Sequence, residues 1–453
     1  MKKAEVTVFL SLVFVLLFSF IAAIIESASI QVAKNYKRGD MDRAVESVFA
    51  EYQKELLEDY DIFALEATYE TGDFVYENVM DRLVYYGAGE GEREIMGIRL
   101  LTDSGGQPFR EQAAAYIENK LGIDSLNLLS GETQKWSNQN EESEEYQTEE
   151  QTVNQEMNVM LDEAEESLPE EDNPLTNISN IKNSTLLSIV VPDQEQISNK
   201  QVEINKLPSK RSINSGYGTF EVPNMNSALL QAAIGEYILE HFQSFTDEAE
   251  EGALSYEAEY ILGGKQSDQE NLEFVVKKLI NIRFVSNYVH LQGDTQKKAE
   301  AQALALSLCT LLTVPGISEV VKQAILLAWA YGESIMDIRS LLGGKSVALV
   351  KTADNWQLSL SGLLTLGTDE DRKEGADMDG GLSYNEYLRI LLFTANQNDL
   401  SMRTLDMIEK NLQVKKGFTF FKADQCISAL QVQSCYTLRR GIRYQFQTNG
   451  GYQ

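Results

Sequence analysis

The stretch that decides the architecture is residues 6–25, VTVFLSLVFVLLFSFIAAII. It carries no charge and has about the length that a helix needs to cross the hydrocarbon core of a bilayer. Lys2 and Lys3 precede it, and Glu26 is the first charged residue after it. Because cationic flanks stay on the cytoplasmic side, this pattern predicts a single-pass anchor with a cytoplasmic N-terminus and an extracellular C-terminal ectodomain.

The alternative to an anchor is a cleaved signal peptide. The apolar run is longer than usual for a signal peptide, and cleavage after Ala23 or Ser29 would match the small-x-small pattern poorly. We therefore expect an intact anchor in the cell membrane, and its marker positions are Val6, Thr7, Val8, Phe9 and Ile25.

The charge of the whole chain narrows the choice of partners. The sequence has 39 basic and 69 acidic residues, a net charge of −30. A charge of this sign repels nucleic acid, anionic lipid and anionic wall polymers at long range. We expect no nucleic-acid partner, and we interpret the charge as an aid to solubility outside the cell. Hydrophobic residues make up 43% of the chain, which is enough for a folded core.

Cysteine and histidine are too few for a disulfide framework or a structural zinc site. Of the three cysteines, Cys309 lies in an apolar stretch and is expected to be buried, while Cys426 and Cys435 could either pair or stay free. The two histidines, His241 and His290, lie on expected helices and are expected to serve packing. We therefore expect no cofactor.

Residues 41–56 continue the chain beyond the anchor as a helical stripe, because their apolar residues recur at spacings of three and four. Gly39 interrupts this helix at a cost of about 1 kcal/mol, enough to bend it. The stripe could pack against helices of other proteins or against the protein's own next elements. Its packing positions are Val45, Val48, Phe49, Tyr52 and Leu56.

The remaining sequence predicts an α+β fold. Strand signals at 60–67 and 95–101 and a helix over 108–121 give a small α+β unit within residues 26–131. Residues 132–172 hold fifteen acidic residues and one basic residue, which predicts a disordered linker. Residues 173–453 are expected to form a mainly helical ectodomain. Its expected elements are a strand at 186–192, helices at 227–245, 271–288, 297–313, 318–342 and from 384, and a strand pair within 418–446.

The helices at 297–313 and 318–342 are apolar nearly all round and are expected at the centre of the core. A second membrane crossing is disfavoured because residues 303–314 are too short and because Lys322, Glu333 and Asp337 interrupt the next helix.

Two glycine-rich segments suggest ligand sites. Residues 343–346, GGKS, lack the earlier glycine and the preceding strand of a phosphate loop, so they are interpreted as a helix C-cap, as are residues 263–265. Residues 375–386 resemble an EF-hand calcium loop, but Gly375 removes the first carboxylate. We expect a structural role there; the ligands of the disfavoured calcium site would be Asp377, Asp379, Ser383 and Glu386.

The N-terminal segments KKAEVTVFLSLVFVLL and AIIESASIQ resemble those of TadE- and TadG-like pseudopilins of tight-adherence (Flp-type) pilus systems. The stretches AVESVFAEYQKELLEDYDIFAL, AILLAWAYGESIMDIRSLLGGK and GLSYNEYLRILL resemble an uncharacterised family of anaerobic Gram-positive bacteria encoded near such pilus genes. Phe9 stands where TadE-like proteins have a glutamate, and Ala4 replaces glycine at the peptidase junction, so the resemblance implies neither cleavage nor polymerisation.

This resemblance implies a minor pseudopilin or assembly factor that contacts the membrane and other pilus-system or surface proteins. The alternative is an anchored surface adhesin or ligand-binding protein unrelated to pili. An extracytoplasmic enzyme ranks third, because no catalytic constellation stands out in the sequence and we expect no enzymatic activity.

Overall fold

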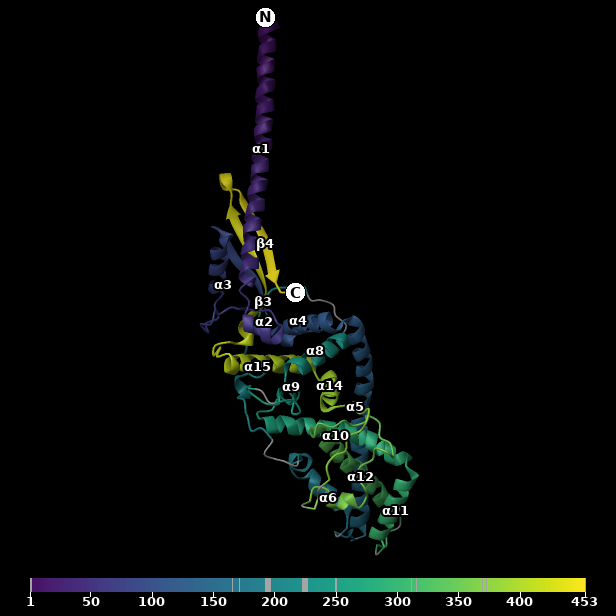
Figure 1. Ribbon diagram of the computed structural model, residues 1–453. Helices are drawn as coiled ribbons and strands as arrows, with labels where there is room; N and C mark the ends of the chain where they lie inside the picture. Colours follow the sequence, from purple (N-terminus) through teal and green to yellow (C-terminus); the bar gives the residue numbers. More distant parts are fainter. Residues whose placement is uncertain are drawn as a thin grey trace. The chain divides into compact units, whose positions relative to one another are not determined.

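The computed structural model describes residues 2–164, 166–170, 172–191, 197–221, 227–248, 251–310, 312–314, 316–368, 370–371 and 373–452, without the side chains of 2–4, 130 and 132–147 (Figure 1). The fold is α+β, as predicted. The chain forms two compact units. Unit 1 contains Met1–Gln112, Ser212–Pro223 and Lys416–Gln453, and unit 2 contains Ala113–Arg211 and Asn224–Lys415.

Unit 1 begins with α1 (Lys2–Phe49), which passes through Gly39 without a break. In the described part of the chain, α1 is the one helix long and apolar enough to cross a membrane. The other elements of unit 1 are α2 (Lys54–Tyr60), β1 (Leu65–Glu66), α3 (Tyr76–Leu83), η1 (Val84–Ala88), β2 (Glu92–Leu100), the start of α4 (Asp103–Leu121), η4 (Ala423–Gln425), β3 (Cys426–Thr437), η5 (Arg439–Gly441) and β4 (Arg443–Gly451).

The sheet of unit 1 is antiparallel, and β3 is its central strand. β2 pairs with one edge of β3, and β4 and β1 pair with the other. The predicted C-terminal strand pair therefore exists, but its assignment to the helical ectodomain is wrong, because it completes the N-terminal unit. This placement depends on pairings such as Ile98 with Leu430, which local periodicity cannot reveal.

Unit 2 is helical. Its elements are the rest of α4, α5 (Ile123–Glu163), α6 (Pro174–Lys182), α7 (Leu187–Val190), η3 (Ile204–Lys206), α8 (Ser227–His241), α9 (Glu257–Gly263), α10 (Asp268–Gly293), α11 (Thr295–Leu308), α12 (Ile317–Leu342), α13 (Gly362–Thr365), α14 (Tyr384–Thr394) and α15 (Gln397–Lys415). The predicted helices at 227–245, 271–288, 318–342 and from 384 correspond to α8, α10, α12 and α14.

Three predictions about unit 2 are wrong. Most of the expected linker, residues 132–172, is the second part of α5, where Met157 and Leu161 are buried. The expected strand at 186–192 is the short helix α7 as far as Val190. The helix α11 is peripheral, because Leu306 is 55% exposed and only three of its residues are buried. Small alanines make α11 look apolar without giving it a wide buried face.

None of the three cysteines, Cys309, Cys426 and Cys435, forms a disulfide. Cys426 and Cys435 lie at the two ends of β3, nine residues apart, which corresponds to about 30 Å along a strand. They cannot form a disulfide with each other within this fold. Cys309 follows the end of α11 and is half-buried.

Candidate functional site

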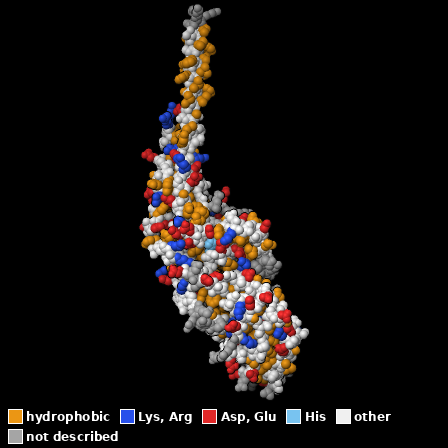
Figure 2. Space-filling model, in the orientation of Figure 1, with side chains coloured by type: hydrophobic (Ala, Val, Ile, Leu, Met, Phe, Trp, Pro, Cys, Tyr) orange, Lys and Arg blue, Asp and Glu red, His pale blue; other side chains and the backbone are white. Residues whose placement is uncertain are grey.

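The apolar half of α1 lies outside the core of unit 1. Figure 2 shows its hydrophobic side chains along the free part of the helix. Phe9, Phe14 and Phe18 are 66%, 69% and 67% exposed, and the uninterrupted exposed apolar run extends from Val6 to Ile25. A soluble monomer rarely exposes a continuous apolar surface of this size. The helix therefore presents a surface that a bilayer or other apolar helices would cover.

The second half of α1 belongs to the core of unit 1. Met41, Ala44, Val45, Val48 and Phe49 are buried in one cluster with side chains from β2, β3 and β4. The helical stripe thus packs on the protein's own unit, which decides between the two alternatives that the periodicity left open.

Tyr52 and Leu56, the last two packing positions, lie beyond the end of α1. Leu56 is buried in α2, and the Tyr52 ring contacts that of Phe63 at 5.2 Å between centroids. The predicted stripe is therefore divided between two helices.

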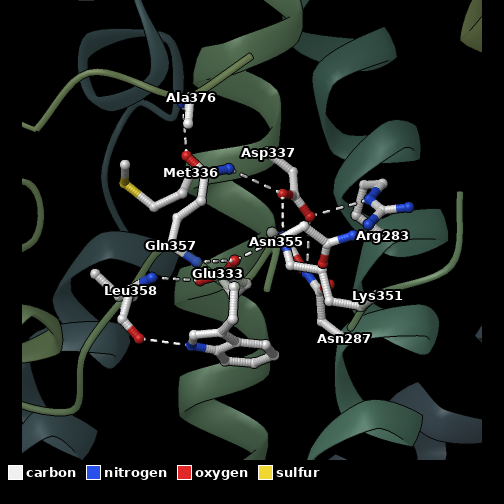
Figure 3. A network of polar contacts seen from close by, with 12 residues as sticks. Arg283, Asn287, Glu333, Met336, Asp337, Lys351, Asn355, Gln357, Leu358 and Ala376 are labelled. Carbon is white, nitrogen blue, oxygen red and sulfur yellow. Dashed lines mark hydrogen bonds and ion pairs between the residues drawn. The ribbon is translucent and has the colours of Figure 1, made fainter. Parts of the chain in front are cut away.

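A buried cluster of charges lies in unit 2 between α10 and α12 (Figure 3). Asp337 pairs with Arg283 Nε at 3.0 Å and with Lys351 Nζ at 2.7 Å. Lys351 Nζ also lies 2.6 Å from Glu333 Oε1. All four side chains are fully buried. Two cations thus balance two carboxylates away from water, where an unpaired ion would cost several kcal/mol.

Neutral donors complete the surroundings of the two carboxylates. Glu333 accepts hydrogen bonds from the backbone N–H groups of Gln357 and Leu358, both at 2.7 Å. Asp337 accepts from Asn287 Nδ2 at 3.0 Å and from Gln357 Nε2 at 3.3 Å. The network therefore ties the loop that carries Gln357 to α12, and Asn287 joins α12 to α10.

Burial and the neighbouring cations act in opposite directions on the pKa values of Asp337 and Glu333. Burial alone would raise the pKa of Asp337, but Arg283 and Lys351 outweigh it and hold that pKa below its usual value. Burial raises the pKa of Glu333, and Lys351 offsets part of this effect. The sequence did not predict this network. There, Glu333 and Asp337 indicated only that their helix does not span a membrane. No motif marks their partners, because Arg283 lies 54 residues from Asp337.

A cleft of about 650 Å³ opens beside the network. Gln357 connects the two, because it lines the cleft and donates to Asp337. Apolar side chains of Met336, Trp356 and Met378 contribute to the wall. The charged residues that line the cleft are Asp354, Lys373, Glu374, Asp377 and Asp379. Four of these five residues are acidic, so the rim of the cleft is mainly acidic.

The two glycine-rich segments pack against each other. Lys345 Nζ donates to the carbonyl of Gly375 at 2.6 Å, and the backbone N–H of Ser346 donates to Asp377 Oδ1 at 2.8 Å. A Cβ on Gly375 would lie 2.3 Å from the backbone nitrogen of Ser340. This close approach leaves no space for a carboxylate at the first position of the calcium-like loop.

The other candidate calcium ligands have structural contacts. Ser383 and Glu386 form a capping box at the start of α14, in which Glu386 Oε2 accepts from the Ser383 N–H at 2.8 Å. Asp379 lines the cleft. In the described ranges, no group of three or more His, Cys, Asp or Glu residues is placed to hold a metal. The C-cap interpretation is confirmed, because Gly264 and Gly344 adopt φ of 61° and 73° at helix ends.

The histidines serve packing. The His241 ring stacks on Tyr237 at 4.3 Å, and the His290 ring lies 5.4 Å from that of Trp356. Burial lowers the pKa of His290.

Two further buried carboxylates in unit 2 are bound by neutral donors. Glu259 Oε1 accepts from the Phe245 N–H at 2.9 Å and from Tyr384 Oη at 2.8 Å. Asp406 Oδ2 accepts from Tyr260 Oη at 2.8 Å. Burial raises the pKa of Glu259 to about 7 and that of Asp406 to about 6. Sequence reasoning missed both, because carboxylates are too abundant in this chain for any one to stand out.

The chain matches the sequence model of one known protein family. Residues 162–438 match the family described as "Family of unknown function (DUF5702)", and the chain belongs to that family. The matched residues include most of unit 2 and the central strand β3 of unit 1. No curated protein and no solved structure matches the chain.

Proposed function

We propose that this protein is a single-pass cell-surface protein that acts as a minor pseudopilin or assembly factor of a tight-adherence pilus, through protein contacts and without catalysis. One observation carries the proposal: α1 runs unbroken from an exposed apolar half to a half buried in unit 1. A lateral contact made by the first half is thereby joined rigidly to a folded unit. The N-terminal resemblance to TadE- and TadG-like proteins supports the same role.

The surface for such contacts extends beyond residues 6–25. Val32 and Tyr36, one helical turn apart, are 52% and 70% exposed. The opposite side of the helix is occupied, because Lys34 and Lys37 lie over the rings of Tyr444 and Tyr436. The free face of α1 therefore offers two further large apolar side chains for a neighbouring helix.

Site-specific photocrosslinking in cells tests the proposal. Crosslinkers at Thr7, Phe14, Phe20, Val32 and Tyr36 should trap another protein of the pilus locus, and deletion of the gene should reduce surface fibres. A crosslinker at Tyr85, which is 75% exposed elsewhere in unit 1, is the matched control and should trap none. Normal fibres in the deletion strain, together with crosslinks only within this chain, would refute the pilus role.

The second candidate function is a surface receptor for a soluble ligand. The cleft beside Gln357 favours it, because an acidic rim with Trp356 and two methionines suits a cationic, partly apolar ligand such as a basic peptide. Titration of the protein with a lysine- and leucine-containing peptide should then show binding that Trp356→Ala weakens. Equal binding by the variant would refute this candidate.

A further inference from the structure

We propose that the turn between β3 and β4 binds anionic phospholipid headgroups at the membrane surface, and that the basic residues of the adjoining part of α1 attract the same lipids electrostatically from further out. The six basic residues that form this site, called the basic collar here, are Lys34, Lys37, Arg38, Arg439, Arg440 and Arg443. The inference rests on the part of the proposed function in which α1 spans the membrane, and it does not depend on a pilus.

The turn between β3 and β4 lies beside the end of the apolar run of α1. Arg440 Nη1 lies 2.6 Å from Glu26 Oε1, and Glu26 follows the apolar run directly. Figure 1 shows this turn as the part of unit 1 that lies nearest to the free half of α1. The headgroup region of one leaflet is roughly 5–7 Å thick. When residues 6–25 cross the hydrocarbon core, the turn therefore reaches the depth of the lipid phosphates.

The collar reverses the charge of the chain locally. Arg440 and Arg443 pair with Glu26 and Glu92, yet their side chains remain 74% and 68% exposed. Arg439 at the turn is also exposed. Each of the three arginines thus has donors free to face outward, in a protein whose net charge is −30.

The collar continues along α1, where three cations are held by aromatic rings. Lys34 lies 5.2 Å from the ring of Tyr444, and Arg38 lies 5.4 Å from that of Phe446. Lys37 is held in the same way, 5.2 Å from Tyr436. Cation–π contacts fix these side chains on one side of the helix without neutralising them. The positive charge therefore extends from the turn along the side of α1 that faces β4.

The chemistry of the turn also suits an interface. Leu438 and Ile442 flank the arginines and are only half-buried. Segments that combine aliphatic side chains with arginine lie stably at the boundary between headgroups and acyl chains. Arg440 adopts φ of 61°, a left-handed conformation that a residue other than glycine or asparagine seldom takes. The turn thus places the positively charged Arg440 in a backbone conformation that arginine rarely adopts.

Hydrogen exchange of the full chain in lipid nanodiscs tests the site. Backbone exchange in residues 438–443 should be roughly fivefold slower, or more, in discs of phosphatidylcholine with phosphatidylglycerol than in phosphatidylcholine alone, because each basic residue near an anionic surface contributes about that factor. High salt should remove the difference. The triple variant Arg439→Gln, Arg440→Gln, Arg443→Gln should lose it, and the milder Arg439→Gln should reduce it.

The charge-matched control is Lys54→Gln, Lys206→Gln, Lys277→Gln, at exposed positions that pair only with nearby glutamates. It should behave as the unmodified protein. Equal exchange in the two disc types, an undiminished lipid effect in the arginine variant, or loss of the effect in the lysine control would overturn the site. So would equal slowing by inorganic phosphate in phosphatidylcholine discs, because it would mark a general anion site. Protein that enters neither disc type would refute the anchor and the site together.

Discussion

Val45 of α1 packs directly against Gly450 of β4. A Cβ at residue 450 would lie 2.2 Å from Val45 Cγ1. The long N-terminal helix α1 and the last strand β4 are therefore in contact through a position where only glycine fits.

Gly450→Ala should destabilise unit 1 by about 1–3 kcal/mol, the usual cost of overpacking a core. Hydrogen exchange of β3 in the full chain in detergent measures this local stability. Gly39→Ala is the control, because a Cβ there meets nothing within 4 Å. It should leave exchange in β3 unchanged, and an equal effect of the two variants would contradict the packing described.

Lys351→Met should destabilise unit 2 by about 3–5 kcal/mol, because it leaves Glu333 and Asp337 buried with one cation between them. Urea denaturation followed by circular dichroism measures the loss. Lys277→Met removes an exposed pair with Glu273 and should cost less than about 0.5 kcal/mol. Similar midpoints for both variants would show that the buried network does not stabilise the fold.

Unit 2 should become less stable as the pH rises toward 7. The pKa of Glu259 is raised from 4.5 to about 7 and that of Asp406 from 3.8 to about 6, so both groups favour the folded state when protonated. Their contribution is complete below about pH 4 and is lost by about pH 7.

Glu259→Gln keeps the acceptor for the Phe245 N–H and Tyr384 Oη and removes the titration. The loss of unfolding free energy between pH 5 and pH 7.5 should therefore be smaller in this variant than in the unmodified protein, by an amount on the order of 3 kcal/mol at most. Urea denaturation of both proteins at the two pH values measures this loss. Parallel pH profiles for the two proteins would refute the assignment.

Leu16→Arg should release the protein from membranes or abolish insertion, because an arginine at the centre of a span costs about 2.5–3.5 kcal/mol. Carbonate extraction separates anchored from released protein. Tyr36→Arg introduces the same charge outside the apolar run and should leave the protein in the membrane fraction. A mature N-terminus near Ser29 in the unmodified protein would instead establish a cleaved signal peptide.

Calcium should not bind tightly at residues 375–386. Gly375 has no space for a side chain, and the Glu386 carboxylate already accepts from the Ser383 N–H. Calorimetry of the full chain should show no micromolar site, the range of complete sensor loops. A one-to-one isotherm that Glu386→Gln abolishes would overturn this expectation.

The sequence predicted those parts of the fold that local periodicity specifies. The apolar half of α1 and the helices α10 and α12 follow from runs of apolar residues with helical spacing. The pairing of β3 could not be predicted, because its partner β2 lies more than 300 residues earlier in the chain. Composition could not predict α5, because its many acidic and amide side chains outnumber the buried residues Met157 and Leu161. Tyr288 Oη donates to Glu149 at 2.9 Å and helps to hold that helix.

The candidate sites show the same limit. The exposed face of α1 was predictable, because it is one uninterrupted run. The ion-paired network and the basic collar were not, since each assembles residues from distant segments, as Lys34 and Arg440 illustrate. The net charge of −30 predicts repulsion from anionic surfaces, but an average over the chain carries no information about where its few cations gather.

The central position of β3 has a consequence for biosynthesis. The ribosome completes β2 at Leu100 and reaches β3 only at Cys426. At 5–20 residues per second, this interval lasts on the order of twenty to sixty seconds. During that time the whole of unit 2 is synthesised, while the edge of β2 that pairs with β3 stays open on the nascent chain. A factor that shields this edge would therefore act early in synthesis, and its task would end when residues 426–437 arrive.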